Sequence, residues 1–344
     1  MMTNPTTPIP APSFTPEDLA SQASQGLIEQ NAFVTASFMP KVLRVLKIEY
    51  HAEFTLSPCP IYRALLFADG VKFAVEWVVK HEYIVITPNQ LVTMLFNGPQ
   101  AKSVEGYLQI EGLHRLDRPD TIFSIFHTAP LDWFANHIEL RQKAQEAWEL
   151  LDDKNRGLIN AVLFEGDLFK RFCKGPSSTS HHHNYLNGNI EHTLEVVFNV
   201  AQNMRRYPTA NEQLTLVFAW LHDIGKADEY SPTFDSADPS RSYKLTPDGF
   251  FHGHKMNGLN LIVKAQLKYL PSYPVASFDN LRHLMEATVN SGSSGFRPPQ
   301  MLEHLLVSNA DSASAAANLY ARAYKPGQSW GIAPDKSLNF RYEV

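Results

Sequence analysis

Cysteine is scarce in this chain of 344 residues, and its two cysteines, Cys59 and Cys173, lie far apart. Their separation argues against a disulfide framework and against a cysteine-rich zinc site. Long apolar runs are missing too, because no stretch reaches the about 18 apolar residues that a membrane-spanning helix needs. The first twenty residues lack a basic segment followed by an apolar one, so no signal peptide is predicted. We therefore expect a cytoplasmic protein with no membrane partner.

An excess of positive charge is also missing, since the formal net charge is −5. This balance does not indicate a nucleic-acid-binding surface, although a basic groove can lie on an acidic protein. What the sequence does contain is 44% hydrophobic residues, enough for sizeable cores, and 14 histidines. The length predicts more than one domain, and the histidines matter for function only if they converge in space.

Two kinds of hydropathy pattern follow one another along the chain. Apolar and polar residues alternate on both sides of Asp69-Gly70, which predicts two strands joined by a tight turn. Further short strands are expected up to about residue 120, and their number and size suggest a small OB-like barrel. From about residue 131 the spacing becomes helical. One helical face is predicted to hold Trp133, Ile138, Leu140, Ala144, Trp148 and Leu151.

The predicted fold class is therefore α+β and multidomain, with a small β-barrel followed by an all-α domain. A long loop is expected over 228–254, and a loop of that length is often functional. The predicted segments are a flexible arm with a short helix at 1–35, an OB-like domain at 36–122, a helical connector at 123–174, a helical domain at 175–325 and a tail at 326–344.

The adjacent pair His222-Asp223 follows the apolar run LTLVFAW, which predicts that it stands at the end of a buried helix. Imidazoles and carboxylates hold the divalent metals that activate water. Neighbouring residues on a helix are about 100° apart, so both side chains can lean toward one ion. Lys226 lies one turn further on, where its charge could meet a phosphate.

Other segments supply further ligands at separate points of the chain. His192 begins an amphipathic helix whose apolar stripe includes Val196, Val197 and Val200; His252 and His254 precede another helix; and Asp311 lies within a helix that starts near Pro299. A buried carboxylate such as Asp311 needs a partner, and a cation would supply one. This order of ligand types over about 120 helical residues is more specific than any single member.

Each of these residues also has an ordinary structural interpretation. A single His-Asp dipeptide is a weak signal, His192 could be a partly buried core histidine, and Asp311 could cap a helix through the preceding Ser-Asn. The run His181, His182 and His183 could be a solvated polar loop rather than part of a site. The sequence alone leaves these alternatives open.

The pattern of His192, then LHDIGK, then Asp311 resembles the HD superfamily of metal-dependent phosphohydrolases. The segments HHHNYLNGNIEHTLEV, AWLHDIGKADEY and GFFHGH are more similar to the HD-domain 3′–5′ exoribonucleases of the YhaM type, which place an OB-like domain before the HD domain. HD-type relaxase-like proteins of mobile elements begin similarly. The resemblance covers about residues 175–325.

The resemblance implies roles for individual residues. His192, His222, Asp223 and Asp311 would hold the principal metal, expected to be manganese, with Mg²⁺, Fe²⁺ or Zn²⁺ as alternatives. His254 would bind a second ion or a phosphate. Asp223 and Lys226 would be catalytic; the residues expected to bind substrate are Lys226, Arg297, His182 and His183.

One segment departs from the family's pattern. Asn290 and Ser291 stand about where the family has a His-His-Gly segment, and asparagine and serine are poorer ligands. A complete single-metal set is therefore expected rather than a full two-metal site, and a structural role is expected for His283. The function expected is a metal-dependent phosphodiesterase, a 3′–5′ exonuclease on single-stranded RNA or DNA. The candidates for stacking on bases, which are core residues by default, are Tyr62, Phe73, Trp77, Tyr83 and Phe96. The alternatives are an HD phosphohydrolase of free nucleotides and a degenerate HD binding or scaffold protein of a mobile-element system. A homo-oligomer is compatible with each of these functions.

Overall fold

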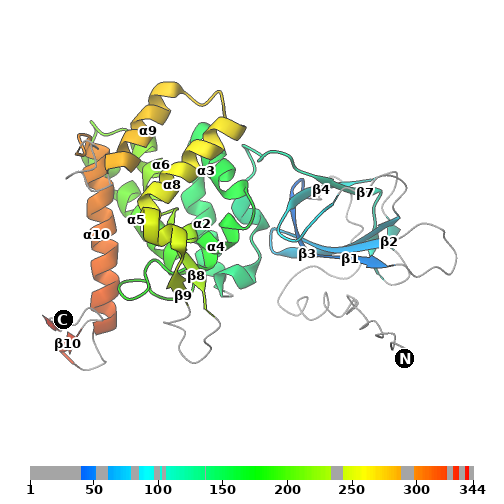
Figure 1. Cartoon of the computed structure of the whole chain (residues 1–344), viewed down its shortest axis with the longest axis horizontal. Coiled ribbons are helices and arrows are strands. Elements are labelled where there is room, and N and C mark those ends of the chain that lie inside the picture. Colours follow the sequence, from blue (N-terminus) through cyan, green and yellow to red (C-terminus); the bar gives the residue numbers. More distant parts are fainter. Residues whose placement is uncertain are drawn as a thin grey trace, which may run out of the picture. The chain divides into compact units, whose positions relative to one another are not determined.

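The computed structural model divides between Leu116 and Asp117 into two compact units, a sheet unit and a helical unit (Figure 1). The residues that it describes are 40–51, 61–78, 85–96, 101–102, 106–135, 137–233, 243–287, 298–323, 328–332 and 338–340. Several predictions fall outside these residues. They are the N-terminal arm with its short helix, Tyr83, Asn290, Ser291 and Arg297.

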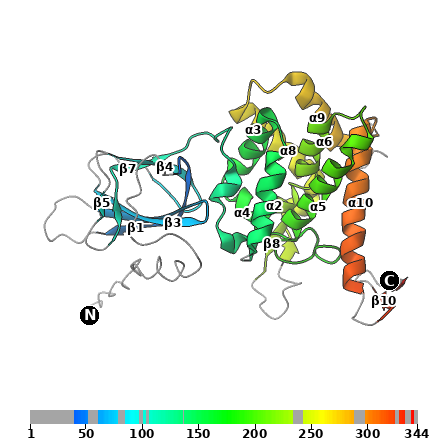
Figure 2. The same ribbon diagram turned by 180° about the vertical axis from the view of Figure 1, so that it is seen from behind.

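The sheet unit is one curled, mostly antiparallel sheet with the strand order β5-β6-β3-β2-β1-β4-β7. Figure 2 shows β4 and β7 lying across from β1 and β3, so the sheet forms a half-barrel. This curl fits the OB-like expectation. The strands are β1 (Leu43–His51), β2 (Ile61–Ala68), β3 (Val71–Val78), β4 (Leu91–Leu95), β5 (Ala101–Lys102), β6 (Leu108–Gln109) and β7 (Gly112–Arg115).

The predicted hairpin at Asp69-Gly70 is confirmed. Strands β2 and β3 pair in register from Ile61↔Val78 to Ala68↔Val71. Both turn residues have positive φ, 51° and 82°, the backbone that a two-residue hairpin turn requires. Inside the curl the core is aliphatic, with Leu43, Val45, Ala64, Leu66, Val75 and Val92 fully buried. Phe73, Trp77 and Phe96 pack partly against this core.

The helical unit confirms the change of pattern along the chain. Its helices are α2 (Ile138–Glu149), α3 (Asp153–Phe164), α4 (Leu168–Lys174), α5 (Gly188–Asn203), α6 (Glu212–Leu221), α7 (Lys226–Glu229), α8 (Pro247–Tyr269), α9 (Val275–Ala287) and α10 (Leu302–Ala323), with 3₁₀ turns η2 (Ile125–Thr128), η3 (Leu131–Phe134) and η4 (Met204–Arg206). Two-stranded pairs are formed by β8 (Tyr230–Pro232) with β9 (Tyr243–Leu245), and by β10 (Trp330–Ile332) with β11 (Leu338–Phe340).

Two sequence predictions need correction here. Trp133 and Ile138 do not share a helical face, because Ala135 adopts a left-handed backbone (φ 49°) that ends η3 before α2 begins. Ile138 is therefore 51% exposed, whereas Trp133 and Trp148 are buried. The segment 228–254 is not one long loop either, since it contains the end of α7, the β8–β9 pair and the first turn of α8.

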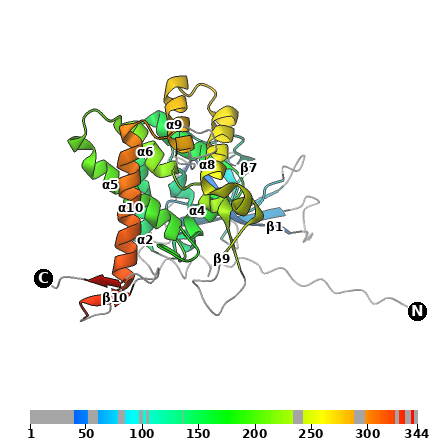
Figure 3. The same ribbon diagram turned by 60° about the vertical axis from the view of Figure 1, so that its left-hand side comes forward.

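Helix α6 is the centre of the helical unit. Every residue from Leu214 to Leu221 is buried, and α5, α9 and α10 pack around it. Figure 3 shows α10 running beside α5 and α6 along much of its length. The Asn211 side chain caps α6 by accepting from the Leu214 amide, so the helix begins at a fixed point. No helix in the described part of the chain is long and apolar enough to cross a membrane.

Candidate metal centre

Four elements bring histidines and aspartates together around the end of α6. His192 lies in the first turns of α5, and His222 and Asp223 end α6 as predicted from the apolar run before them. Asp311 lies in the middle of α10, so it does not cap a helix. The side chains of His192, His222 and Asp223 are 0%, 7% and 7% exposed, and they are not the ordinary surface polar groups that the dipeptide alone would allow.

Asp223 is the common neighbour of the three imidazoles. Its Oδ2 lies 3.4 Å from the Nε2 atoms of both His192 and His222. Its Oδ1 lies 3.5 Å from Nε2 of His254, which comes from α8. Asp311 Oδ1 approaches His192 Nε2 to 3.1 Å. The structure thus brings together the residues predicted as metal ligands from α5, α6, α8 and α10.

The other ring nitrogen of each histidine is already engaged. His222 Nδ1 lies 2.7 Å from the carbonyl oxygen of Ala219, to which it must donate. His192 Nδ1 lies 2.8 Å from Ser314 Oγ, and that hydroxyl donates to Glu195 at 2.6 Å, so Ser314 accepts from His192. Because each Nδ1 is a donor, each neutral ring directs the Nε2 lone pair toward the carboxylates.

This arrangement fits a divalent cation. Nε2 of His192 and Nε2 of His222 are buried without a hydrogen-bond partner. Ligand atoms of His192, His222 and Asp311 lie within 4.8 Å of one another. Buried lone pairs facing carboxylate oxygens leave acceptors without a donor, and a cation would satisfy all of them. Imidazole nitrogens and carboxylate oxygens suit manganese, iron and zinc.

The carboxylates and cations around the centre shift its ionisations. Burial by itself raises the pKa of Asp223, but Lys226 and the neighbouring histidines outweigh burial and hold this pKa well below its usual value. Burial disfavours a charged His192, yet Asp223 and Asp311 raise its pKa overall. Asp223 is therefore an anion at neutral pH, which is the state in which a carboxylate binds a metal.

Lys226 lies inside the centre and not on an open surface. Its Nζ is 2.5 Å from Asp223 Oδ2 and donates to Ser177 Oγ at 2.9 Å, and the residue is only 8% exposed. Gly225, just before it, has no room for a side chain, because a Cβ there would overlap the carbonyl oxygen of His254. This close approach brings α7 and α8 together and carries His254 to the centre.

His254 is oriented by a residue that the sequence analysis did not single out. Its Nδ1 lies 2.8 Å from Oε2 of Glu229, which leaves Nε2 facing Asp223. Glu229 ends α7, three residues after Lys226. This helical spacing within KADE is the one sequence signal that could have found it. Gly253 (φ 70°, ψ 163°) interrupts α8 just before His254. His252, by contrast, is turned to solvent and pairs with Asp248.

His182 and His183 flank the centre on the side of His192. Their rings lie 5.2 and 5.3 Å from the His192 ring, centroid to centroid, and ligand atoms of the three histidines lie within 4.8 Å of one another. His183 is fully buried, with Nε2 3.4 Å from Glu195. Burial, then the charge of Lys226, lowers the pKa of His182 to about 4. His181 is exposed, and His283 lies near His304 instead of the centre.

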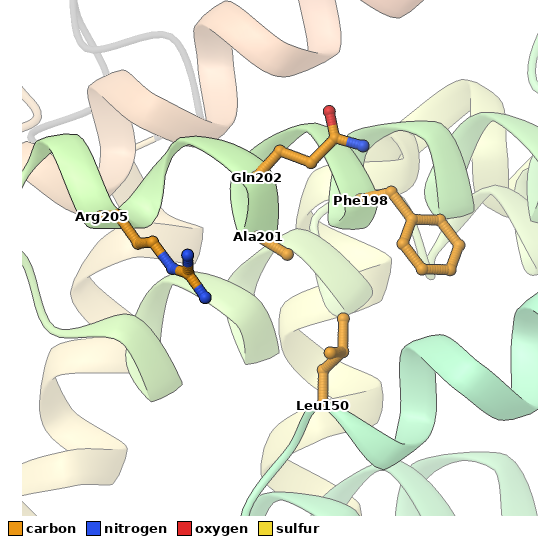
Figure 4. Close-up of a pocket in the computed structure, with 5 residues that line it drawn as sticks. All are labelled: Leu150, Phe198, Ala201, Gln202 and Arg205. Atoms are coloured by element: carbon orange, nitrogen blue, oxygen red, sulfur yellow. The ribbon is translucent and has the colours of Figure 1, made fainter.

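A shallow pocket of about 350 Å³ lies on another part of the helical unit (Figure 4). It is lined by Leu150 at the end of α2 and by Phe198, Ala201, Gln202 and Arg205 on and just after α5. None of these side chains belongs to the histidine–aspartate cluster. The pocket therefore adds nothing to the chemistry of the centre.

A curled half-barrel sheet followed by helices that enclose a histidine–aspartate cluster defines a two-unit protein with a candidate divalent-metal centre. One curated protein is similar in sequence: the 3′-5′ exoribonuclease YhaM of Halalkalibacterium halodurans is 26% identical over 196 residues, which are 55% of this chain and 57% of that protein. The chain thus matches little more than half the length of this distant homologue. No family model matches the chain, and no solved structure does.

Proposed function

We propose that this protein is a metal-dependent phosphodiesterase that acts on single-stranded nucleic acid as a 3′–5′ exonuclease. The observation that carries the proposal is the convergence of three Nε2 atoms on Asp223, in rings whose Nδ1 atoms are already engaged. Distant homology to a 3′-5′ exoribonuclease supports the same reaction class. The HD-superfamily assignment, manganese and the 3′–5′ direction are part of this proposal.

His192, His222, Asp223 and Asp311 would hold the metal, and His254 would face a second ion or a phosphate oxygen. A bound divalent ion lowers the pKa of water and polarises a phosphoryl oxygen, the chemistry that hydrolysis of a phosphodiester needs. The carboxylate of Asp223 would also orient the attacking water, because one of its oxygens is not needed for the ion. Arg297, which lies outside the described residues, would bind the substrate's phosphates.

Lys226 would stabilise charge that develops on the phosphate. Its ammonium group lies 2.5 Å from Asp223 Oδ2. When Asp223 holds a metal, the Lys226 ammonium group would be available to a phosphate oxygen beside it. Ser177 would keep the ammonium close to the centre through its hydrogen bond. Buried and already positioned, such a charge stabilises a transition state more strongly than one in water. His182 and His183, which flank the centre, would also bind the substrate.

The sheet unit would bind the strand away from the scissile bond. Tyr50, Tyr62 and Trp77 form a row across β1, β2 and β3, with ring centroids 5.3 and 5.5 Å apart. Tyr50 is 52% exposed, so the row reaches solvent at that end. Exposed aromatic rings on a curled sheet offer surfaces on which unpaired bases stack.

The test is incubation of 5′-labelled single-stranded RNA and DNA with the full chain and manganese. We expect a ladder of products shortened one nucleotide at a time from the 3′ end. Discrete internal cuts would contradict the exonuclease, and hydrolysis of free nucleotides alone would favour a nucleotide phosphohydrolase. The variant Asp223→Asn keeps the side-chain shape and should lower the rate on the order of 10³-fold or more.

The matched control is Asp248→Asn, because Asp248 is 56% exposed and pairs with the surface residue His252. This variant should cleave like the wild-type chain. Metal analysis of the purified protein separates the remaining alternative. If the protein binds neither manganese, iron nor zinc, and Asp223→Asn cleaves as fast as Asp248→Asn, the metal-dependent reaction is wrong and a binding or scaffold role takes its place.

A further inference from the structure

Two adjacent phenylalanines stand exposed beside the candidate metal centre. Phe250 and Phe251 are 73% and 76% exposed, and their rings meet edge to face with the centroids 5.4 Å apart. An exposed pair of large aromatic side chains costs free energy in water and usually marks a binding surface. Among the described residues of the helical unit, neither the ligand set nor the buried core includes these rings.

The backbone fixes the direction in which the two rings face. Thr246 caps the first turn of α8 by accepting from the Gly249 amide. Gly249 is packed so closely against Glu229 that a Cβ there would overlap its backbone and side chain. Because the Gly249 side of the turn lies against α7, Phe250 and Phe251 are left on the outer side. The turn is thus anchored to Glu229, the residue that also orients His254.

The same short segment connects the rings to the centre. Phe251 precedes His254 by three residues, so their Cα atoms are at most roughly 11 Å apart. His254 Nε2 in turn lies 3.5 Å from Asp223 Oδ1. A single strand with a phosphate at the centre is therefore long enough to reach Phe250 and Phe251. Lys244, exposed on β9 just before this turn, adds a positive charge for a neighbouring phosphate.

We propose that Phe250 and Phe251 form a stacking platform for the unpaired bases of a single-stranded nucleic acid whose phosphate lies at the metal centre. Every base has a π-face, so two phenyl rings bind bases without selecting a sequence. Bases within a duplex are stacked on one another and do not offer these faces. This inference rests on the proposed function, and it adds the part of the substrate that the ligand residues do not contact.

The first measurement is the affinity for a fluorescent 12-nucleotide single strand, followed by anisotropy in EDTA so that no hydrolysis occurs. The double variant Phe250→Ala/Phe251→Ala should bind about tenfold or more weakly than the wild-type chain. Phe250→Leu/Phe251→Leu keeps apolar area but lacks the aromatic face, and it should lose most of the same affinity. The control is Leu267→Ala, because Leu267 is 69% exposed on α8 but lies far along the helix from His254.

The second measurement compares two substrates with manganese present. For the double alanine variant, the ratio of kcat/KM for the single strand to kcat/KM for bis(p-nitrophenyl) phosphate should fall at least tenfold, because the small diester has no base to stack. Leu267→Ala should keep the wild-type ratio. An equal loss on both substrates would mean that the rings support the centre itself, and the platform would be wrong.

Other outcomes of these two measurements also test the stacking platform. Wild-type affinity in the alanine variant would overturn the proposal, as would full affinity in the leucine variant, since simple apolar contact would then suffice. A change of mass by light scattering in the alanine variant would assign the rings to contact with a second copy of the chain. If the wild-type chain hydrolyses neither substrate, the proposed function fails, but the anisotropy comparison still tests the platform separately.

Discussion

The two units of this protein bury different chemistry. In the described part of the sheet unit, Arg44 is the only charged residue that is buried as a whole, and it donates to the carbonyl oxygen of Asn89 at 2.5 Å. The helical unit buries polar and charged side chains throughout, among them His183, His192, His222, Asp223 and Lys226. The sheet unit is held by its ladder and an aliphatic core, whereas the helical unit carries groups that need a further partner.

This difference between the two interiors indicates which unit holds the functional site. An interior of Leu, Val and Ala is explained by packing alone. Two histidine Nε2 atoms without hydrogen-bond partners beside two carboxylates are not explained by packing, because each one lowers the stability of the folded unit. Buried polar groups that destabilise the fold when they have no partner indicate that a ligand binds there. The predictions below test whether the two units respond as differently as their interiors suggest.

Removing the metal should give the largest contrast. Chelation should abolish hydrolysis and destabilise the helical unit, because a cation binds only the folded centre. At a concentration of 100 times its Kd, manganese would contribute about 2.7 kcal/mol, or roughly 5–10 °C in Tm for a unit of this size. Hydrogen exchange should slow in α5, α6 and α10 on adding manganese and stay the same in β1 to β4. Equal protection of both units would contradict the assignment of the metal to the helical unit.

Loss of the carboxylate behind His254 should have a smaller effect. Glu229→Gln removes the carboxylate charge whose Oε2 lies 2.8 Å from His254 Nδ1, so the ring is less well directed at Asp223. Removing such a supporting carboxylate typically costs 10- to 100-fold in metal affinity. Calorimetric titration with manganese measures the metal affinity of each variant. Glu286→Gln, on α9 beside Arg282, is the control, and equal affinities in the two variants would remove Glu229 from the centre.

The pH dependence of stability should come partly from His182. Its folded pKa of about 4 lies below the unfolded value of about 6.5, because burial and then Lys226 disfavour its charged form. The unfolded chain therefore binds the extra proton between these values, and stability is full above pH 6.5 and lost as the pH falls toward 4. In chelator, His182→Gln should show a shallower fall of Tm over this window than the wild-type chain. Parallel curves would show that His182 does not titrate as its surroundings require.

The smallest effect is expected in the sheet unit. Tyr62 is stacked on Trp77 and half-covered, so Tyr62→Ala should weaken single-strand binding by only about 1 kcal/mol, the low end for a base–aromatic contact. Manganese affinity, measured on the same preparation, should stay at the wild-type value because the metal ligands belong to the helical unit. A change in manganese affinity would mean that the two units are coupled.

The sequence predicted those parts of the structure that depend on local pattern. The hairpin at Asp69-Gly70, the helix carrying His192 and the end of α6 at His222 all follow from periodicity and turn chemistry. Ile138 was assigned to a buried face because the break at Ala135 has no sequence signal: alanine rarely adopts a left-handed backbone. Glu229 and Ser314 were missed because their roles depend on contacts between helices.

Ligand identity was easier to predict than ligand geometry. The types and order of His192, His222, Asp223 and Asp311 were visible in the sequence, since imidazoles and carboxylates are the residues that such metals need. The ring orientation was not visible, because it is set by Ala219, by Ser314 and by Glu229. The contact of Lys226 with Asp223, by contrast, joins residues three apart in one helical turn, and Gly225 between them has a right-handed helical backbone.

Helix α10 supplies both Asp311 and Ser314, and they meet His192 from 119 and 122 residues further along the chain. Contacts of such long sequence separation form late in folding, because the entropy of closing a long loop is lost before the contacts stabilise the chain. A chain that has been synthesised only through α9 lacks one carboxylate of the centre and the hydroxyl that sets the His192 tautomer. Competence to bind a metal is thus tied to completion of the helical unit, and a nascent or truncated chain without α10 would carry an unfinished centre.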